Sequence, residues 1–169
     1  TSETVMTDCA SFTPLSHEGI LAVRGPDAKT FLQGQITCHL GYVSDERSSL
    51  GARCTPKGRM LSSFRVLLEN DGYLLAMDKD ILVAQLAELQ KFAVFSKTKL
   101  TDDSALWSRF GLYPGDPALT ALGIELPLDS NSTVHHNNMI AVRVSSDLVE
   151  LWVHADEGPC LRKRLLGHL

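Results

Sequence analysis

The stretch FRVLLENDGYLLAM, residues 64–77, decides the fold class. Apolar Phe64, Val66 and Leu68 alternate along its first part, which is typical of a strand with one buried face. The sequence Asn-Asp-Gly at 70–72 is typical of a tight turn, and residues 73–77 return as a second apolar strand. The stretch therefore predicts an antiparallel β-hairpin.

The flanking sequence predicts two helices and two further strands. Residues 20–24 read as a short strand, and Gly25-Pro26 opens a helix, since proline suits the first helical turn. Asp80 is the expected N-cap of a second helix, and residues 93–100 are expected to be extended. The order over residues 17–104 is β-α-β-β-α-β, so we expect an α+β fold of ferredoxin-like halves with antiparallel sheets.

The remaining segments carry weaker patterns. We expect residues 1–16 to be an irregular arm, because they are polar and contain Pro14. Residues 105–169 are expected to form a second α+β half, with a strand at 107–113 and a hairpin within 139–153. We expect this half to be truncated and a C-terminal barrel to be absent, because the sequence stops inside a predicted helix.

Composition limits the function classes. The chain has 169 residues, of which 44% are hydrophobic and 21% charged, as in globular domains. A net charge of −4 gives no broad positive field, so we expect no direct DNA binding. No apolar run reaches membrane-spanning length, and no signal peptide is evident. The four cysteines match no metal-ligand spacing, so we expect no metal, reduced thiols and a cytoplasmic location.

The segment from Arg53 to Arg65 is unusually cationic. It also contains Lys57 and Arg59 but no acidic residue, and Pro56-Lys57-Gly58 is a predicted turn. Such a cluster favours a site for an anionic small molecule, for example the glutamate tail of a folate. The alternative is a solvated strand face paired to acids elsewhere. No catalytic triad or phosphate-binding loop motif accompanies it, so we expect no catalytic residue.

Three blocks of sequence resemble the superfamily of YgfZ and the glycine cleavage T-protein. They are residues 23–37, beginning Val-Arg-Gly-Pro-Asp-Ala; residues 52–60, Ala-Arg-Cys-Thr-Pro-Lys-Gly-Arg-Met; and residues 89–97, Leu-Gln-Lys-Phe-Ala-Val-Phe-Ser-Lys. The resemblance implies the N-terminal, folate-binding region of a YgfZ-type protein. It also implies tetrahydrofolate or a derivative as ligand, and a cytoplasmic accessory role for iron–sulfur enzymes, including those that thiolate tRNA.

The blocks and the cationic cluster together name six candidate folate-binding residues. They are Gln35, Lys57, Arg59, Arg65, Phe95 and Lys97. Gln35, Phe95 and Lys97 rest on the blocks. Lys57, Arg59 and Arg65 rest on charge clustering. The roles of Cys54 and His39 stay open.

The sequence also departs from the family. The family's K-G-C-[YF]-x-G-Q-E block is absent, and Cys54 does not replace its reactive cysteine. Leu61-Ser62 stands where the T-protein carries an Asp pair, which disfavours aminomethyltransferase activity. Two alternatives stay open: a folate-dependent aminomethyltransferase of the T-protein class, or a non-catalytic protein-interaction module that uses the sheet face or residues 92–97. Phe92 and Phe95 are otherwise expected to be core residues.

Overall fold

The hairpin predicted at residues 64–77 lies inside a five-stranded antiparallel sheet. Strands β5 (Met60–Glu69) and β6 (Gly72–Asp78) pair with Val66 opposite Leu75. The sheet order is β4-β5-β6-β3-β7, where β3 is Glu18–Arg24, β4 is Ser49–Cys54 and β7 is Lys99–Asp102. The predicted hairpin is confirmed, although turn residues 70 and 71 lie outside the part of the chain that the structure describes.

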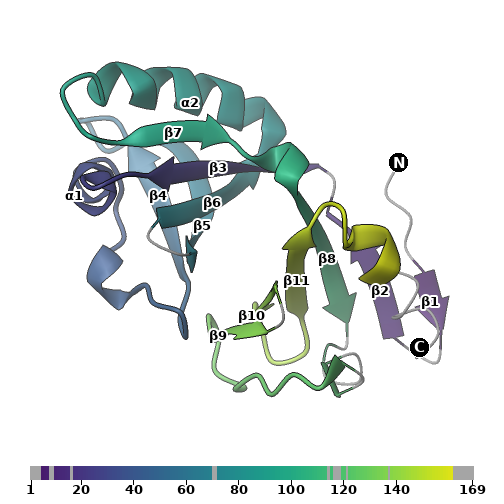
Figure 1. The fold of residues 1–169 in the computed structure, drawn as a ribbon. Coiled ribbons are helices and arrows are strands. Elements are labelled where there is room, and N and C mark those ends of the chain that lie inside the picture. The colour runs from purple at the N-terminus through teal and green to yellow at the C-terminus, as the bar shows by residue number, and fades with distance from the viewer. Residues whose placement is uncertain are drawn as a thin grey trace. The chain divides into compact units, whose positions relative to one another are not determined.

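The computed structural model describes residues 5–7, 10–15, 17–69, 72–113, 115, 119–120, 122–136 and 138–161. The chain divides into two units. The continuous unit is His17–Ser104, and the discontinuous unit joins Thr1–Ser16 to Ala105–Leu169. Each unit contains one antiparallel sheet (Figure 1).

Two helices pack on the sheet of the continuous unit (Figure 1). Helix α1 spans Ala28–Gln33 and helix α2 spans Lys79–Phe92. The two helices bury Leu32, Leu82 and Leu89 in one core with Val66 and Leu75 of the sheet. Burial of this helical face, at about 25 cal/mol per Å² of apolar area, is the main stabilising contribution to the unit.

The strand order of the continuous unit confirms the predicted ferredoxin-like arrangement. Strands β5-β6-β3-β7 are the second, third, first and fourth strands of a β-α-β-β-α-β unit, and β4 adds an edge. Two details differ from the prediction. The N-cap of α2 is Asp78, whose Oδ1 accepts a hydrogen bond from the Asp80 backbone N–H at 2.9 Å. The last strand begins only at Lys99, because residues 93–98 form turns and bends.

The discontinuous unit holds a six-stranded sheet in the order β1-β2-β8-β11-β10-β9. Its strands are β1 (Val5–Thr7), β2 (Ala10–Pro14), β8 (Trp107–Tyr113), β9 (Thr133–His136), β10 (Met139–Arg143) and β11 (Val149–His154). The predicted strand at 107–113 and the β10–β11 hairpin are present. The expectation of an irregular arm was wrong for residues 5–7 and 10–14, because β2 pairs with β8 far along the chain.

The two sheets share one arrangement of strands. Strands β10-β11-β8-β2 of the discontinuous unit correspond in order to β5-β6-β3-β7, and β9 takes the place of the edge strand β4. The fourth position is occupied by β2, which precedes β8, β9, β10 and β11 in sequence. The half expected at residues 105–169 is therefore completed by residues 10–14.

None of the helices in the described part of the chain combines the length and the apolarity that crossing a membrane requires.

Candidate functional site

The predicted cationic turn lies at the tip of the β4–β5 hairpin. The backbone N–H of Thr55 donates to the carbonyl of Arg59, and that of Gly58 donates to the carbonyl of Thr55, both at 2.8 Å. Gly58 has a φ of +83°, a conformation that glycine adopts without strain. Lys57 and Arg59 are both exposed on this turn. The hairpin tip therefore presents two cations to solvent.

The other two cations of this segment point into the continuous unit. Arg53 is 7% exposed, and its Nη1 donates to Gln85 Oε1 at 2.9 Å and to the Glu88 carboxylate. Arg65 is 8% exposed, and its Nη1 donates to Ser48 Oγ at 2.9 Å. Arg53 therefore has the acidic partner that the alternative interpretation of the cluster required, and the four cations do not form one surface.

The first and third family-like blocks meet at Asp27 and Lys97. The backbone N–H of Lys97 donates to Asp27 Oδ2 at 2.9 Å, and the backbone N–H of Asp27 donates to the Lys97 carbonyl at 3.2 Å. Gly25 has a φ of +115°, and a Cβ there would lie 2.4 Å from the Lys97 carbonyl oxygen. This close approach therefore requires glycine.

The side chains of the third block face solvent. Phe95 is fully exposed and Phe92 is 60% exposed, so the expectation that both are core residues was wrong. The physical reason is that α2 ends at Phe92 and the following turns direct these side chains away from the sheet. The Lys97 side chain is exposed as well.

Gln35 is half-buried just after α1. The neighbouring Gln33 makes the polar contacts of this region: its Oε1 accepts from the Leu40 backbone N–H at 2.7 Å, and its Nε2 donates to the Cys38 carbonyl at 2.9 Å. The six candidate residues thus lie on the α1 end, the β4–β5 hairpin and the α2–β7 loop. They remain predictions.

A cluster that the sequence did not reveal lies on β8 and β11 of the discontinuous unit. We call it the Trp152 cluster; its members are Trp107, Arg109, Glu150, Trp152 and His154. Arg109 donates to the Glu150 carboxylate, and its guanidinium carbon lies 4.4 Å from the Trp152 ring centre. The rings of Trp107 and His154 stack with centres 4.7 Å apart.

Trp152 is the buried centre of this cluster. It is 0% exposed, and its indole Nε1 has no hydrogen-bond partner among the described residues. Such an unpaired buried N–H costs about 1–3 kcal/mol. Arg109 lies opposite Trp152, and Trp107 opposite His154, in the β8–β11 register. The sequence signals were single charged residues within two apolar strands, Arg109 in β8 and Glu150 in β11. Only the pairing of β8 with β11 brings these two residues together.

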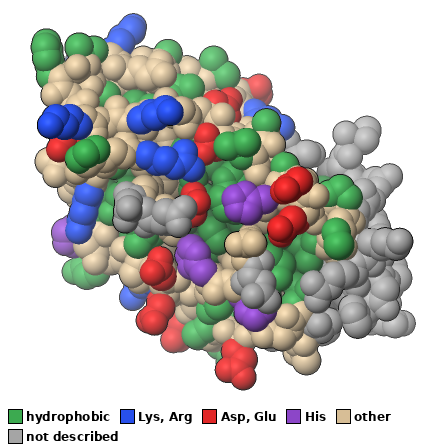
Figure 2. Space-filling model, viewed as in Figure 1, with side chains coloured by type: hydrophobic (Ala, Val, Ile, Leu, Met, Phe, Trp, Pro, Cys, Tyr) green, Lys and Arg blue, Asp and Glu red, His purple; other side chains and the backbone are tan. Residues whose placement is uncertain are grey.

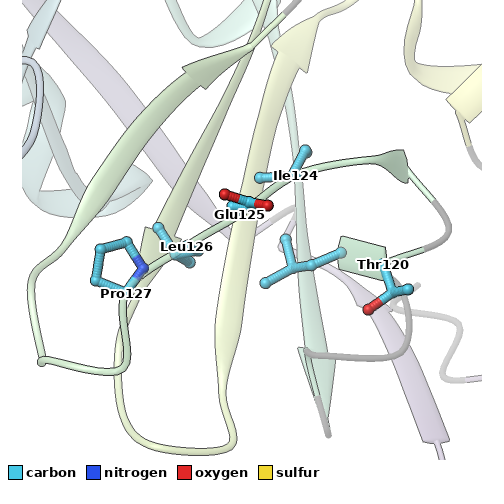
Figure 3. Close-up of a pocket in the computed structure, with 6 residues that line it drawn as sticks. Thr120, Ile124, Glu125, Leu126 and Pro127 are labelled. Atoms are coloured by element: carbon cyan, nitrogen blue, oxygen red, sulfur yellow. The ribbon is translucent and has the colours of Figure 1, made fainter.

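A pocket of about 590 Å³ also lies in the discontinuous unit (Figure 3). It is lined by Leu119, Thr120, Ile124, Glu125, Leu126 and Pro127. Arg143 is fully buried and donates to the carbonyls of Leu126 at 3.2 Å, Pro127 at 3.1 Å and Ser146 at 3.1 Å. Arg143 therefore holds the chain that forms one wall of this pocket.

Within the described residues, no group of three His, Cys, Asp or Glu side chains could hold a metal ion. Cys54 and Cys160 are exposed, and Cys38 is half-buried. Burial raises the pKa of the Cys38 thiol, and a hydrogen bond with Ser49 partly opposes this shift. Cys9 lies outside the described residues.

The amino-acid sequence is similar to that of several curated proteins. No family model matches. The tRNA-modifying protein YgfZ of Sodalis glossinidius is 34% identical over 120 residues, which are 70% of this chain and 37% of that protein. YgfZ of Aliivibrio fischeri strain MJ11 is 32% identical over 145 residues, or 85% of this chain and 43% of that protein. The chain thus spans less than half the length of these relatives.

Solved structures show the same fold. The glycine cleavage system aminomethyltransferase T from Bartonella henselae superposes with a TM-score of 0.77 over 91% of this chain and 44% of that one, at 19% identity. A chain of heterotetrameric sarcosine oxidase from Corynebacterium sp. U-96 gives 0.67 over 98% of this chain and 86% of that one, at 17% identity. The predicted T-protein-like fold is confirmed. With the fold and the curated relatives in agreement, the chain belongs, over the part of those relatives that it spans, to the YgfZ family.

Proposed function

We propose that this chain is a folate-binding part of a YgfZ-type protein that acts in tRNA modification. The main support for this proposal is the sequence match, over 85% of the chain, to a relative named as a tRNA-modifying protein. The proposed role is that of an accessory protein, which supports iron–sulfur enzymes in the cytoplasm, including enzymes that thiolate tRNA. The T-protein fold supports tetrahydrofolate, or a derivative, as the ligand.

The Trp152 cluster fits the pterin end of a folate. A pterin is a flat ring system that carries N–H donors beside ring-nitrogen and carbonyl acceptors. The Glu150 carboxylate, which also accepts from Arg109, can accept from the donors. The exposed His154 ring, stacked on the buried Trp107 ring, offers an aromatic face.

The exposed β4–β5 turn is a separate candidate site for a carboxylate group such as a folate tail carries, because Lys57 and Arg59 are cations that face solvent. Gln35, Phe95 and Lys97 join the proposed set by family resemblance, and Arg65 joins it by charge clustering. The Trp152 cluster and the turn lie in different units, and variants in each can therefore be scored separately.

Calorimetric titration of tetrahydrofolate into the 169-residue chain tests the proposal. Glu150→Gln should weaken binding at least about tenfold, because a hydrogen bond to a charged group contributes roughly 1.5–3 kcal/mol. Glu157→Gln, which changes an exposed acid just after β11, is the matched control and should leave binding unchanged. The double change Lys57→Gln, Arg59→Gln tests the tail site, with Lys79→Gln as its control. Absence of binding by the unaltered chain would contradict the proposal.

The cellular role needs a second measurement. Deletion of the gene should lower the content of thiolated nucleosides in tRNA, measured by mass spectrometry of digested tRNA. Restoring the gene should recover it, and restoring the Glu150→Gln form should recover less. Unchanged nucleosides after deletion would contradict the accessory role while leaving folate binding intact.

Aminomethyl transfer is a second candidate, because the fold is that of an aminomethyltransferase. The position of the Asp pair is occupied by Leu61, 37% exposed, and Ser62, which is buried. Neither side chain can act as a general base near neutral pH. We therefore expect no methylenetetrahydrofolate from an aminomethylated lipoyl carrier; its formation at a rate above the uncatalysed one would favour this candidate.

A further inference from the structure

The loop that follows α2 exposes an unusual amount of apolar surface. We call residues 91–99, which run from the last residues of α2 to the first residue of β7, the Phe95 loop. Phe92 is 60% exposed, Val94 is 69% exposed and Phe95 is fully exposed. Single exposed apolar residues are common on protein surfaces, but three within four positions mark a binding surface.

The backbone of the Phe95 loop is fixed at both ends. Ala93 is buried, and the backbone N–H of Ser96 donates to the Ala93 carbonyl at 2.9 Å. The Lys97 backbone is held by Asp27, and the hydroxyls of Ser96 and Thr98 lie 2.6 Å apart. The exposed rings are therefore presented by an ordered loop, which lowers the entropy cost of binding.

Lysines surround these apolar side chains. Lys91, Lys97 and Lys99 are exposed, and the loop contains no acidic residue. Figure 2 shows Lys and Arg side chains gathered at the upper left, the part of the view that holds α2 and the loop. With a net chain charge of −4, this positive surface is local.

Two acids beside the loop already accept hydrogen bonds from within the protein. Asp27 accepts from the Lys97 backbone, and Glu88 accepts from Arg53, whose guanidinium lies 5.6 Å from the Phe92 ring centre. The same contact brings the end of β4 to Phe92, so the turn with Lys57 and Arg59 begins close to the loop. An anionic partner at the Phe95 loop would therefore meet mainly cations.

We propose that the Phe95 loop binds single-stranded RNA, with a base stacked on Phe95 and phosphates at Lys97 and Lys99. Exposed aromatic rings beside cations suit single-stranded nucleic acid, because every base has a flat face to stack and a phosphate to pair. Protein interfaces are depleted in lysine, and all three cations of the loop are lysines. The proposal goes beyond the accessory role, since a protein acting through other enzymes needs no RNA contact, and it does not depend on folate binding.

Fluorescence anisotropy of the 169-residue chain with a labelled 12-nucleotide oligo(U) tests the proposal. Phe95→Ala should raise the Kd about 5- to 100-fold, the loss that removal of one stacked base produces. Val83→Ala removes another exposed apolar side chain, 68% exposed on α2, and should leave the Kd unchanged. A duplex RNA, whose bases cannot splay onto a ring, should bind more weakly and show no effect of Phe95→Ala.

Charge is tested separately from stacking. Lys99→Gln should reduce the slope of log affinity against log salt by roughly 0.7, the value for one phosphate contact on a single strand. Lys79→Gln, at the opposite end of α2, should leave the slope unchanged. Circular dichroism melts should be the same for all variants, because each altered side chain is exposed.

Three results would overturn the proposal. The first is no oligo(U) binding in 50 mM salt, and the second is equal losses from Phe95→Ala and Val83→Ala. The third is a different occupant, seen either as self-association that Phe95→Ala abolishes in sedimentation, or as binding of an acidic peptide but not of oligo(U). The folate titration is scored with variants of Glu150, Lys57 and Arg59, none of which is altered in the RNA experiments, so failure of one proposal can be told apart from failure of the other.

Discussion

Asp27 and Lys97 exchange hydrogen bonds across 70 residues of sequence: the Asp27 carboxylate accepts from the Lys97 backbone N–H, and the Asp27 N–H donates to the Lys97 carbonyl. This exchange joins the start of α1 to the Phe95 loop. It is possible because Gly25, two residues earlier, lets the two backbones approach closely.

Gly25→Ala should destabilise the chain. The new Cβ would lie 2.4 Å from the Lys97 carbonyl oxygen and would force a strained φ of +115°, which alone costs about 1–3 kcal/mol. Urea unfolding measures the loss. Gly34→Ala is the matched control, because its φ is −74° and its nearest neighbour would lie at 3.5 Å. Equal stability of the two variants would contradict this account of the contact.

The variant Gly58→Ala separates the cost of backbone strain from the cost of a steric clash. Its φ is +83°, but an added Cβ would meet nothing within 4 Å. We therefore expect a loss of about 1 kcal/mol in unfolding free energy, smaller than that of Gly25→Ala, in the same urea experiment. A larger loss at Gly58 than at Gly25 would contradict the role given to the Lys97 carbonyl.

Arg143→Met should lower stability by at least about 2 kcal/mol, because it removes three hydrogen bonds that a fully buried guanidinium donates to the carbonyls of Leu126, Pro127 and Ser146. Arg143→Lys should recover little, since an ammonium cannot reproduce the planar fork of a guanidinium. Thermal unfolding checks both. Stability of the lysine variant equal to that of the parent would show that charge alone suffices.

Phe95→Ala should change the unfolding free energy by less than about 0.5 kcal/mol, because the side chain is fully exposed. A core phenylalanine would instead cost about 3–5 kcal/mol. Chemical denaturation distinguishes the two values clearly. A loss in the larger range would mean that the ring is packed in solution.

Cys38 should make stability fall at alkaline pH. Burial raises the pKa of its thiol, so the folded state disfavours the thiolate. The contribution to stability is full below the unfolded pKa of about 8.5 and is lost as pH rises through the folded pKa. Unfolding free energies at pH 7 and pH 9.5 should therefore differ less in Cys38→Ala than in the parent. An identical pH dependence would rule out this thiol as the cause.

Local sequence was sufficient for the continuous unit. The alternation around Val66 and the apolar line of α2 each depend on near neighbours, and both elements form where expected. The same reasoning wrongly predicted that Phe95 is a core residue. Whether an apolar residue close to the end of a helix is buried depends on where that helix ends, and the sequence did not show that α2 ends at Phe92. The Trp152 cluster could not be predicted, since it exists only through the β8–β11 register.

Strand β2 was not predicted because it also depends on a distant partner, strand β8. This pairing has a consequence for synthesis of the protein. Phe12 pairs with Leu112, 100 residues later (112 − 12), so β2 leaves the ribosome before β8 and cannot pair with it until those residues have been made. The complete β-α-β-β-α-β module His17–Ser104 emerges in between. Strand β2 thus waits for its partner through the translation of an entire neighbouring module, and closing that long loop places its pairing late in folding.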